Sequence, residues 1–204
     1  MNLILVRHGE TDWNRQKRFQ GGINIPLNSC GKWQAQQAAQ ALAGLRIQQL
    51  FSSDLLRAKE TAESIGGVCG CVVQTDPRLR EKGFGIWEGL TYAEIKERDA
   101  DGYAQWREDP SAYTPPGGEG ADATARRVAQ AWQEIEKNGA ETVVLVSHGG
   151  TLRILLRYLL RLAPESYWQI KLYNASLSYV QIRPDGNRLV LLNDTQHLRG
   201  NSIG

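Results

Sequence analysis

The stretch Thr142-Val143-Val144-Leu145-Val146-Ser147-His148-Gly149-Gly150 decides the fold class of this chain. Its four central residues are apolar without polar alternation, which is typical of a parallel strand covered by helices on both faces. Residues 3–6 have the same character and are followed by Arg7-His8-Gly9. The two segments therefore predict buried strands of one sheet, each ending in a histidine and a glycine.

Elsewhere the chain alternates short apolar runs with longer amphipathic ones. This pattern predicts further strands at residues 47–51 and 68–74, and helices at 31–45, 54–65, 91–106, 121–137 and 150–162. Asp54 is the expected N-cap of the second of these helices. The turn Pro184-Asp185-Gly186-Asn187 predicts a hairpin that joins strands at 176–182 and 188–192.

The order of strands and helices predicts an α/β fold, with three α/β/α layers around a mainly parallel sheet. Residues from about 80 to 120 interrupt this order because they are polar, loop-rich and contain tryptophan. We interpret them as a small inserted cap over one edge of the sheet. The length of 204 residues fits a single domain that covers 1–204.

Composition excludes several classes of protein. Apolar residues make up 41% and the net charge is +2, which excludes wholesale disorder and a strongly basic nucleic-acid or membrane binder. No stretch is apolar enough to span a membrane, and the N-terminus is not a secretory signal. Cys30, Cys69 and Cys71 lack zinc-site spacing and are expected to be reduced thiols of a cytoplasmic protein. We expect no cofactor; the sequence leaves open whether the chain forms a homodimer.

His8 and His148 occupy equivalent places, each at the carboxyl end of a buried strand. In a parallel sheet such ends share one edge, where ligands bind. If the two strands are neighbours, the imidazoles approach each other across a crevice. Arg7 adjoins His8, and Arg57 falls in the first helical turn after another strand. Guanidinium groups, imidazoles and helix N-termini together predict an anion site for a tetrahedral phosphoryl group.

Two other interpretations of the histidines are open. Each could cap its strand by a hydrogen bond, or the pair could bind a metal. The repeated context favours a shared site over capping, and Arg7 beside His8 disfavours a cation. The chain also lacks the glycine-rich phosphate loops of nucleotide-binding proteins.

The residues around these positions resemble the signature of the histidine phosphatase superfamily, the phosphoglycerate mutase-like group. The matching blocks stand in the family's order and cover almost the whole chain: Leu5-Val6-Arg7-His8-Gly9-Glu10-Thr11-Asp12-Trp13-Asn14, Phe19-Gln20-Gly21, Ile25-Pro26-Leu27, Ser52-Ser53-Asp54-Leu55-Leu56-Arg57-Ala58, Leu79-Arg80-Glu81, Gly85-Ile86-Trp87-Glu88-Gly89, Pro116-Gly117-Gly118-Glu119 and Val146-Ser147-His148-Gly149-Gly150. Asn24, Asn28 and Gly120 depart from the family's usual residues, which affects substrate contacts and not the core of the site.

The resemblance implies a role for each matching residue. His8 would be the nucleophile that forms a phosphohistidine, and Glu81 the proton donor to the leaving oxygen. The phosphoryl oxygens would be held by Arg7, Arg57 and His148, and the phosphate pocket lined by Asn14, Gln20, Gly21 and Gly149, without a metal. We expect His8 to be neutral, with its inner N–H held by a backbone carbonyl, and His148 to be protonated.

Other residues have a plainer interpretation. Glu81 could instead pair with Arg78 or Lys82, and Glu10 and Glu88 are lesser candidates for the acid. The stripe Arg153, Arg157 and Arg161 is typical of a solvated helix face. Tryptophans are core or lid anchors by default, although Trp87 and Trp106 could line the mouth of the site. His197 is expected to be structural, with the tail folding over the pocket as the alternative.

Three functions compete at this point: a phosphomonoesterase, a phosphoglycerate mutase, and a non-catalytic module that binds phosphorylated ligands. The short chain and short insertion favour hydrolysis, because mutases of the family resemble longer chains that seal the site from water. The blocks most resemble α-ribazole phosphatases of cobalamin biosynthesis and broad-specificity phosphatases, with phosphoserine phosphatases close behind. We therefore expect a small phosphomonoester as substrate, with α-ribazole 5′-phosphate as the first candidate.

Overall fold

The computed structural model describes residues 1–109 and 113–199. A six-stranded sheet with the order β3-β2-β4-β1-β5-β6 forms its centre. β1 (Asn2–Arg7), β2 (Gln49–Ser52), β3 (Val73–Thr75) and β4 (Thr142–Ser147) are parallel, and the hairpin of β5 (Leu177–Gln181) and β6 (Arg188–Asp194) continues the sheet in antiparallel pairing. The predicted mainly parallel α/β fold is confirmed.

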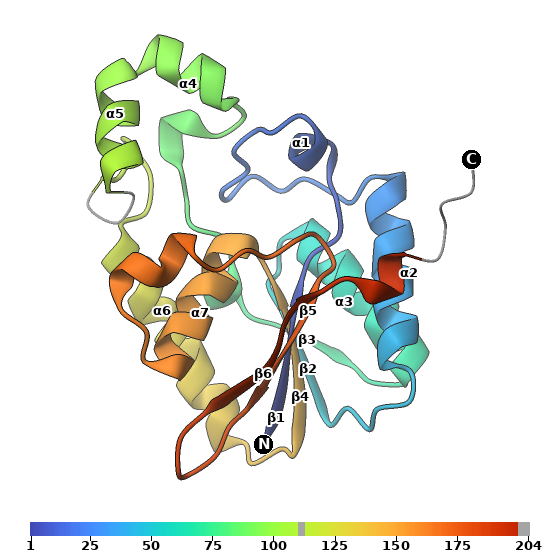
Figure 1. Ribbon diagram of the computed structural model, residues 1–204. Coiled ribbons are helices and arrows are strands. Elements are labelled where there is room, and N and C mark those ends of the chain that lie inside the picture. The colour runs from blue at the N-terminus through green and yellow to red at the C-terminus, as the bar shows by residue number, and fades with distance from the viewer. Residues whose placement is uncertain (110–112, 200–204) are drawn as a thin grey trace.

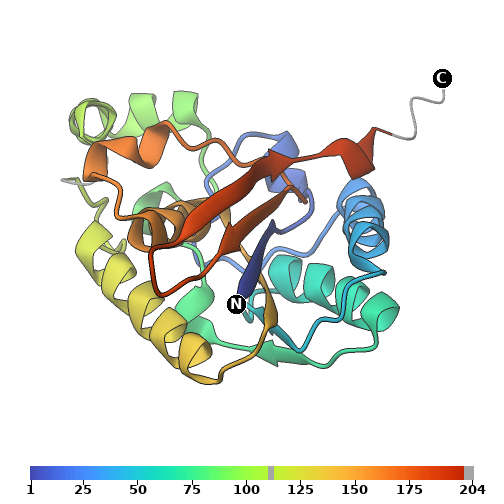
Figure 2. The same cartoon turned by 60° about the horizontal axis from the view of Figure 1, so that its bottom comes forward.

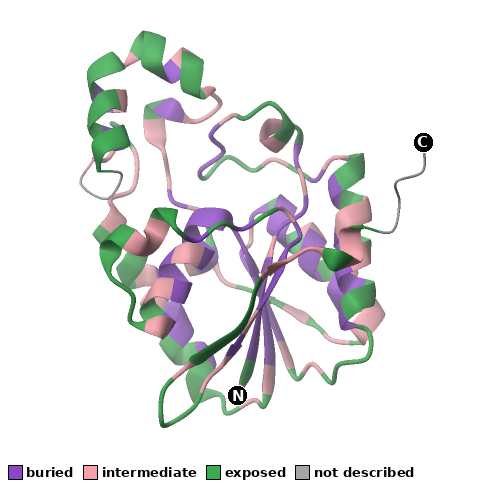
Figure 3. Ribbon diagram, viewed as in Figure 1, coloured by how far each residue is buried: buried purple, intermediate pink, exposed green. Residues whose placement is uncertain are grey.

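Helices cover both faces of the sheet (Figures 1 and 2). α2 (Ser29–Leu42) and α3 (Leu56–Cys69) lie on one side, and α6 (Ala121–Lys137) and α7 (Gly149–Leu160) on the other. Alternate residues of β1 and β4 belong to different hydrophobic clusters, one with α6 and α7 and the other with α2 and α3. Residues 3–6 of β1 and 143–147 of β4 are buried (Figure 3), as their continuous apolar sequences predict.

The pairing of β1 with β4 positions the site. Arg7 stands opposite Ser147 in the parallel register, so the next residues, His8 and His148, leave the sheet at the same level. β4 also pairs with β2, and Ser52 stands opposite Val146. The loop that leads to Arg57 therefore starts from the same edge of the sheet.

The segment between β3 and α6 lies beyond this edge, where α4 (Tyr92–Arg98) and α5 (Ala100–Glu108) stand above the carboxyl ends of the strands (Figure 1). It has its own buried cluster, formed by Phe19, Trp87, Ile95 and Trp106. Phe19 comes from the loop after α1 (Asp12–Arg15). The inserted segment is thus packed on the loop that follows β1. The described part of the chain also contains four short 3-10 helices: η1 (Pro77–Leu79), η2 (Gly85–Trp87), η3 (Pro164–Trp168) and η4 (Gln196–Leu198).

Several predicted boundaries were wrong for local reasons. α3 begins at Leu56, and Leu55 is its N-cap residue. Asp54 does not cap the helix, because its carboxylate forms an ion pair of 2.5 Å with Arg80. α3 continues to Cys69 and ends at the left-handed Gly70, so the predicted strand at 68–74 is reduced to β3.

The helix predicted at 91–106 is two helices, because the Asp99 side chain caps the start of α5. Thr91 and Glu94 form a capping box at the start of α4. Among the described residues, no helix is both long and apolar enough to cross a membrane.

Candidate active site

His8 is buried at the end of β1 and is held in one tautomer. Its Nδ1 lies 2.7 Å from the carbonyl oxygen of Gly9, so Nδ1–H donates and Nε2 keeps its lone pair. The pKa of His8 is lowered well below its ordinary value, first by burial and then by the charges of Arg57 and Arg7. A neutral imidazole with a free outer nitrogen is the form that the sequence predicts for a nucleophile.

His148 lies beside His8, with 5.1 Å between the ring centroids. Its Nδ1 accepts a hydrogen bond of 3.1 Å from Arg57 Nε, and its Nε2 is 2.9 Å from Ser53 Oγ. A guanidinium N–H can only donate, so Nδ1 is unprotonated. Burial first, then the charges of Arg57 and His8, lower the pKa of His148 well below its ordinary value. The expected protonated His148 is therefore wrong.

Arg7 and Arg57 provide two buried positive charges. Arg7 donates to the carbonyl of Leu172 at 2.6 Å, while its Nε is a buried donor with no partner among the described residues. Arg57 donates at 2.8 Å to the carbonyls of Ile23 and Gly21. Burial lowers the pKa of each guanidinium to about 10, so both stay charged at neutral pH.

Asn14 and Gln20 present amide groups to the same pocket. The Asn14 Oδ1 accepts from the Thr11 N–H at 3.1 Å and from Asn174 Nδ2 at 3.1 Å, which turns its NH₂ group away from these partners. The Gln20 Oε1 is 3.0 Å from the Thr11 hydroxyl. Both side chains line the pocket together with Gly21, whose φ of 48° is a conformation that favours glycine.

Glu81 is fixed at the N-terminus of α7. Its carboxylate accepts from the backbone N–H groups of Gly150 at 3.0 Å, Thr151 at 3.1 Å and Lys82 at 3.0 Å. The alternative pairing with Arg78 does not occur, since Arg78 pairs with two other carboxylates. Glu81 lines the pocket that contains His8.

The lesser candidates for the acid have structural contacts elsewhere. Glu10 accepts from the Asn28 side chain at 2.8 Å. Glu88 accepts from the N–H groups of Gly22 and Phe84, each at 2.9 Å, and so ties the loop after β1 to the inserted segment. Neither residue is among those that line the pocket.

The pocket has a volume of about 330 Å³ and lies between the edge of the sheet and the inserted segment. Its outer wall is aromatic, formed by Phe19, Phe84, Tyr92, Trp106, Tyr167 and Trp168. From the sequence, Trp87 and Trp106 could both line the mouth of the site. Trp106 does so, whereas Trp87 is wholly buried beneath it. Gly150 lines the pocket, while Gly149 packs against the Arg7 side chain and does not. A hollow of about 460 Å³ between α7 and the β5–β6 turn contains no histidine.

Sequence reasoning missed two residues that hold the histidines. Asn174 precedes β5, and its Nδ2 lies 3.1 Å from the carbonyl oxygen of His8 and 3.3 Å from that of Gly9. Ser53 is wholly buried under His148. Ser53 lies in a matching block of the family and could have been chosen from it. No local pattern marks Asn174, which is far from His8 in the sequence.

Two other predictions have a clear outcome. The expectation of a solvated face is wrong for Arg153, which lines the pocket, and holds for the exposed Arg161. His197 has the structural role expected of it: its Nε2 lies 3.0 Å from the carbonyl oxygen of Ala175. Within the tail, η4 packs against α2 and is not among the residues that line the pocket, and residues 200–204 lie outside the described residues. No three metal-binding side chains cluster within residues 1–109 and 113–199.

The pocket thus combines a neutral imidazole, whose outer nitrogen keeps its lone pair, with two buried guanidinium groups at the carboxyl edge of a parallel sheet. These are the groups that phosphoryl transfer through a histidine requires. The family comparison agrees. The model of the histidine phosphatase superfamily (branch 1) matches residues 3–195, and the chain belongs to this family. This family match confirms the predicted class of enzyme, a hydrolase of phosphoric monoesters.

Relatives with assigned substrates differ among themselves. The chain is 42% identical over 176 residues to the glucosyl-3-phosphoglycerate phosphatase of Mycobacterium tuberculosis, covering 81% of this chain and 78% of that one. It is 33% identical over 199 residues to phosphoserine phosphatase 1 of Hydrogenobacter thermophilus, covering 97% and 94%. The α-ribazole phosphatase of Shigella flexneri superposes with a TM-score of 0.88 at 30% identity, covering 95% and 96%.

Proposed function

We propose that this chain hydrolyses small phosphomonoesters through a phosphohistidine at His8. The observation that carries the proposal is the fixed tautomer of His8, whose Nε2 lone pair faces a pocket that also holds Arg7 and Arg57. A phosphoryl group placed there would meet the charges of Arg7 and Arg57 and the Asn14 amide. These groups oppose the charge that develops on the equatorial oxygens during transfer.

The reaction has two steps on this chain's own residues. In the first, His8 Nε2 forms a bond to phosphorus as the bond to the leaving oxygen breaks, and Glu81, which must enter this step in its protonated form, donates its proton to that oxygen and becomes a carboxylate. In the second, water attacks the phosphohistidine, Glu81 takes a proton from the water, and His8 is released with inorganic phosphate. His148 supports the site by accepting from Arg57 Nε, and its direct contact with the phosphoryl group stays a prediction.

Water is the proposed acceptor because the inserted segment over the site, residues from about 80 to 120, is short. A mutase must keep water away from its phosphohistidine, and a longer covering segment serves that purpose. The aromatic wall would suit the planar base of α-ribazole 5′-phosphate, which stays a candidate substrate. The expected cytoplasmic location and the absence of a metal requirement also stay predictions.

The proposal is tested by trapping the intermediate. A quenched reaction of the wild type should carry acid-labile phosphate on His8, and His8→Ala should lose both the label and turnover. His197→Gln, which keeps a donor for Ala175, is the matched histidine control and should retain both. Turnover by His8→Ala would show that the nucleophile is misassigned.

Two further assays separate the alternatives. Activity that persists in EDTA agrees with the proposal, whereas loss that added metal restores would favour metal catalysis. Release of phosphate from 3-phosphoglycerate, rather than its isomerisation, separates a phosphatase from a mutase.

A further inference from the structure

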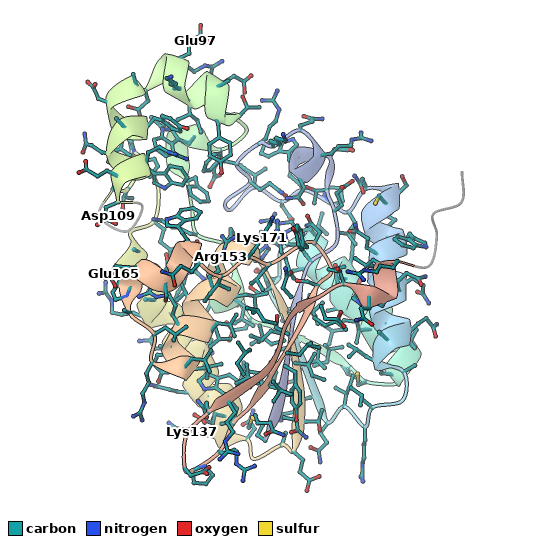
Figure 4. The ribbon with its side chains drawn as sticks, in the orientation of Figure 1. Glu97, Asp109, Lys137, Arg153, Glu165 and Lys171 are labelled. Atoms are coloured by element: carbon teal, nitrogen blue, oxygen red, sulfur yellow. The ribbon has the colours of Figure 1, made fainter. Side chains whose placement is uncertain are left out.

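Arg153 is a guanidinium held in place on the pocket wall. It projects from α7 toward the space beneath the inserted segment (Figure 4). Its Nε donates to the carbonyl of Ile170 at 2.7 Å. Its guanidinium carbon lies 5.3 Å from the ring centroid of Tyr167 and 5.6 Å from that of Trp168, within cation–π range. These contacts fix the plane of the group, so little conformational freedom is lost when it binds an anion.

The pocket contains more positive charge than a phosphoryl group needs. Five cationic side chains line it, against the single carboxylate of Glu81. Arg18 is neutralised by Glu94 at 2.8 Å. Arg7 and Arg57 are the pair that would balance a phosphoryl dianion. Arg153 forms no ion pair with any described residue, and the same holds for Lys17, which also lines the pocket.

The residues around Arg153 do not supply the missing negative charge. Burial raises the pKa of Tyr167 to about 12, so its phenol is neutral at physiological pH. Trp168 has no ionisable group. A fixed, uncompensated guanidinium in a ligand pocket is suited to a planar carboxylate, which its N–H groups can bind in a bidentate manner.

We propose that Arg153 binds a second anionic group on the substrate, a carboxylate, and that the preferred substrates are phosphomonoesters of hydroxy acids. This inference rests on the proposed function, since it assumes that the phosphoryl group sits at His8. It also chooses among the substrates considered above, because α-ribazole 5′-phosphate has no carboxylate. The aromatic wall then has the role of covering Arg153 and excluding water, which strengthens the ion pair.

The test compares substrates that differ only in the carboxylate. O-phosphoserine is paired with O-phosphoethanolamine, and 3-phosphoglycerate with glycerol 3-phosphate. We expect the wild type to prefer the acid of each pair by about 10- to 100-fold in kcat/KM, which is the range for a hydrogen-bonded charged contact. In Arg153→Gln this preference ratio should fall to near one, and Arg153→Lys should retain part of it. Arg157→Gln, one turn further along α7, should keep the wild-type ratio.

The ratio distinguishes recognition from structural support. If Arg153→Gln lowered kcat/KM for both members of each pair equally, Arg153 would only support the wall, and the inference would be overturned. It would also be overturned if the wild type hydrolysed both members equally or preferred α-ribazole 5′-phosphate to either acid. A failure of the proposed function is a different result, because none of the five substrates would then release phosphate.

Discussion

Replacing Asn174 tests whether a residue that lies outside the pocket wall sets the geometry of the nucleophile. Its side-chain amide contacts three oxygens: the carbonyls of His8 and Gly9 and the Oδ1 of Asn14. The Gly9 carbonyl is the group that holds His8 Nδ1–H, and the Asn14 contact turns that amide toward the pocket. Asn174 therefore supports both the tautomer of the nucleophile and a donor to the phosphoryl group.

The magnitude follows from what each oxygen retains in Asn174→Ala. The His8 carbonyl keeps the N–H of Ala175 at 3.1 Å, the Gly9 carbonyl keeps His8, and Asn14 keeps Thr11. No acceptor loses its last partner, so the loss is that of one net amide contact, about 1–2 kcal/mol. If this free energy is lost because the nucleophile is misplaced, kcat/KM decreases by about 5- to 30-fold.

Asn174→Asp has a second, distinctive effect. A carboxylate there faces three oxygens, and its negative charge should raise the pKa of His8. Because His8 must be unprotonated to attack, activity would then be lost at a higher pH as the pH falls. The assay is the pH profile of kcat/KM for both variants, with Asn187→Asp as the matched control, since Asn187 donates to the distant Leu159 carbonyl. An unshifted acid limb in Asn174→Asp, or wild-type activity in Asn174→Ala, would refute this reasoning.

Three further predictions concern the acid, the pH dependence of stability and the packing of the nucleophile loop. Glu81→Gln should lower kcat on alkyl phosphates by about 10²- to 10⁴-fold but affect p-nitrophenyl phosphate far less, since its leaving group needs no acid; equal losses would contradict the role of Glu81. The midpoint of urea unfolding should decrease as the pH falls below about 6.5, because His8 and His148 bind protons in the unfolded chain but stay neutral in the folded one. A midpoint unchanged between about pH 7 and about pH 5.5 would contradict the lowered pKa values. Gly31→Ala should destabilise the fold by about 1–3 kcal/mol in urea unfolding, because its Cβ would overlap the backbone of Glu10, whereas Gly44→Ala has open space; similar midpoints for the two variants would argue against tight packing there.

The centre of the sheet and the core of the site could be predicted because local sequence determines them. Continuous apolar runs identify β1 and β4 as covered strands, and the glycines after them allow close approach at their ends. From this the proximity of His8 to His148 follows without a structure.

The rest depends on tertiary contacts that no local pattern shows. The charge state of His148 is set by burial and by the direction of Arg57 Nε, both of which require the folded chain. Arg153 has the periodicity of an exposed helix face, yet η3 covers that part of the face with Tyr167 and Trp168. Asn174 meets His8 only because the turn before β5 reaches back to the end of β1.

The position of β4 in the sheet has a consequence for biosynthesis. β1 and β2 are not hydrogen-bonded to each other; β4 lies between them and completes both pairings. During translation β1 and β2 leave the ribosome long before β4, so the sheet cannot align the carboxyl ends of these two strands until residues 142–147 arrive. A nascent or truncated polypeptide that stops short of β4 lacks both of these pairings and His148, and we expect it to be inactive toward phosphorylated metabolites.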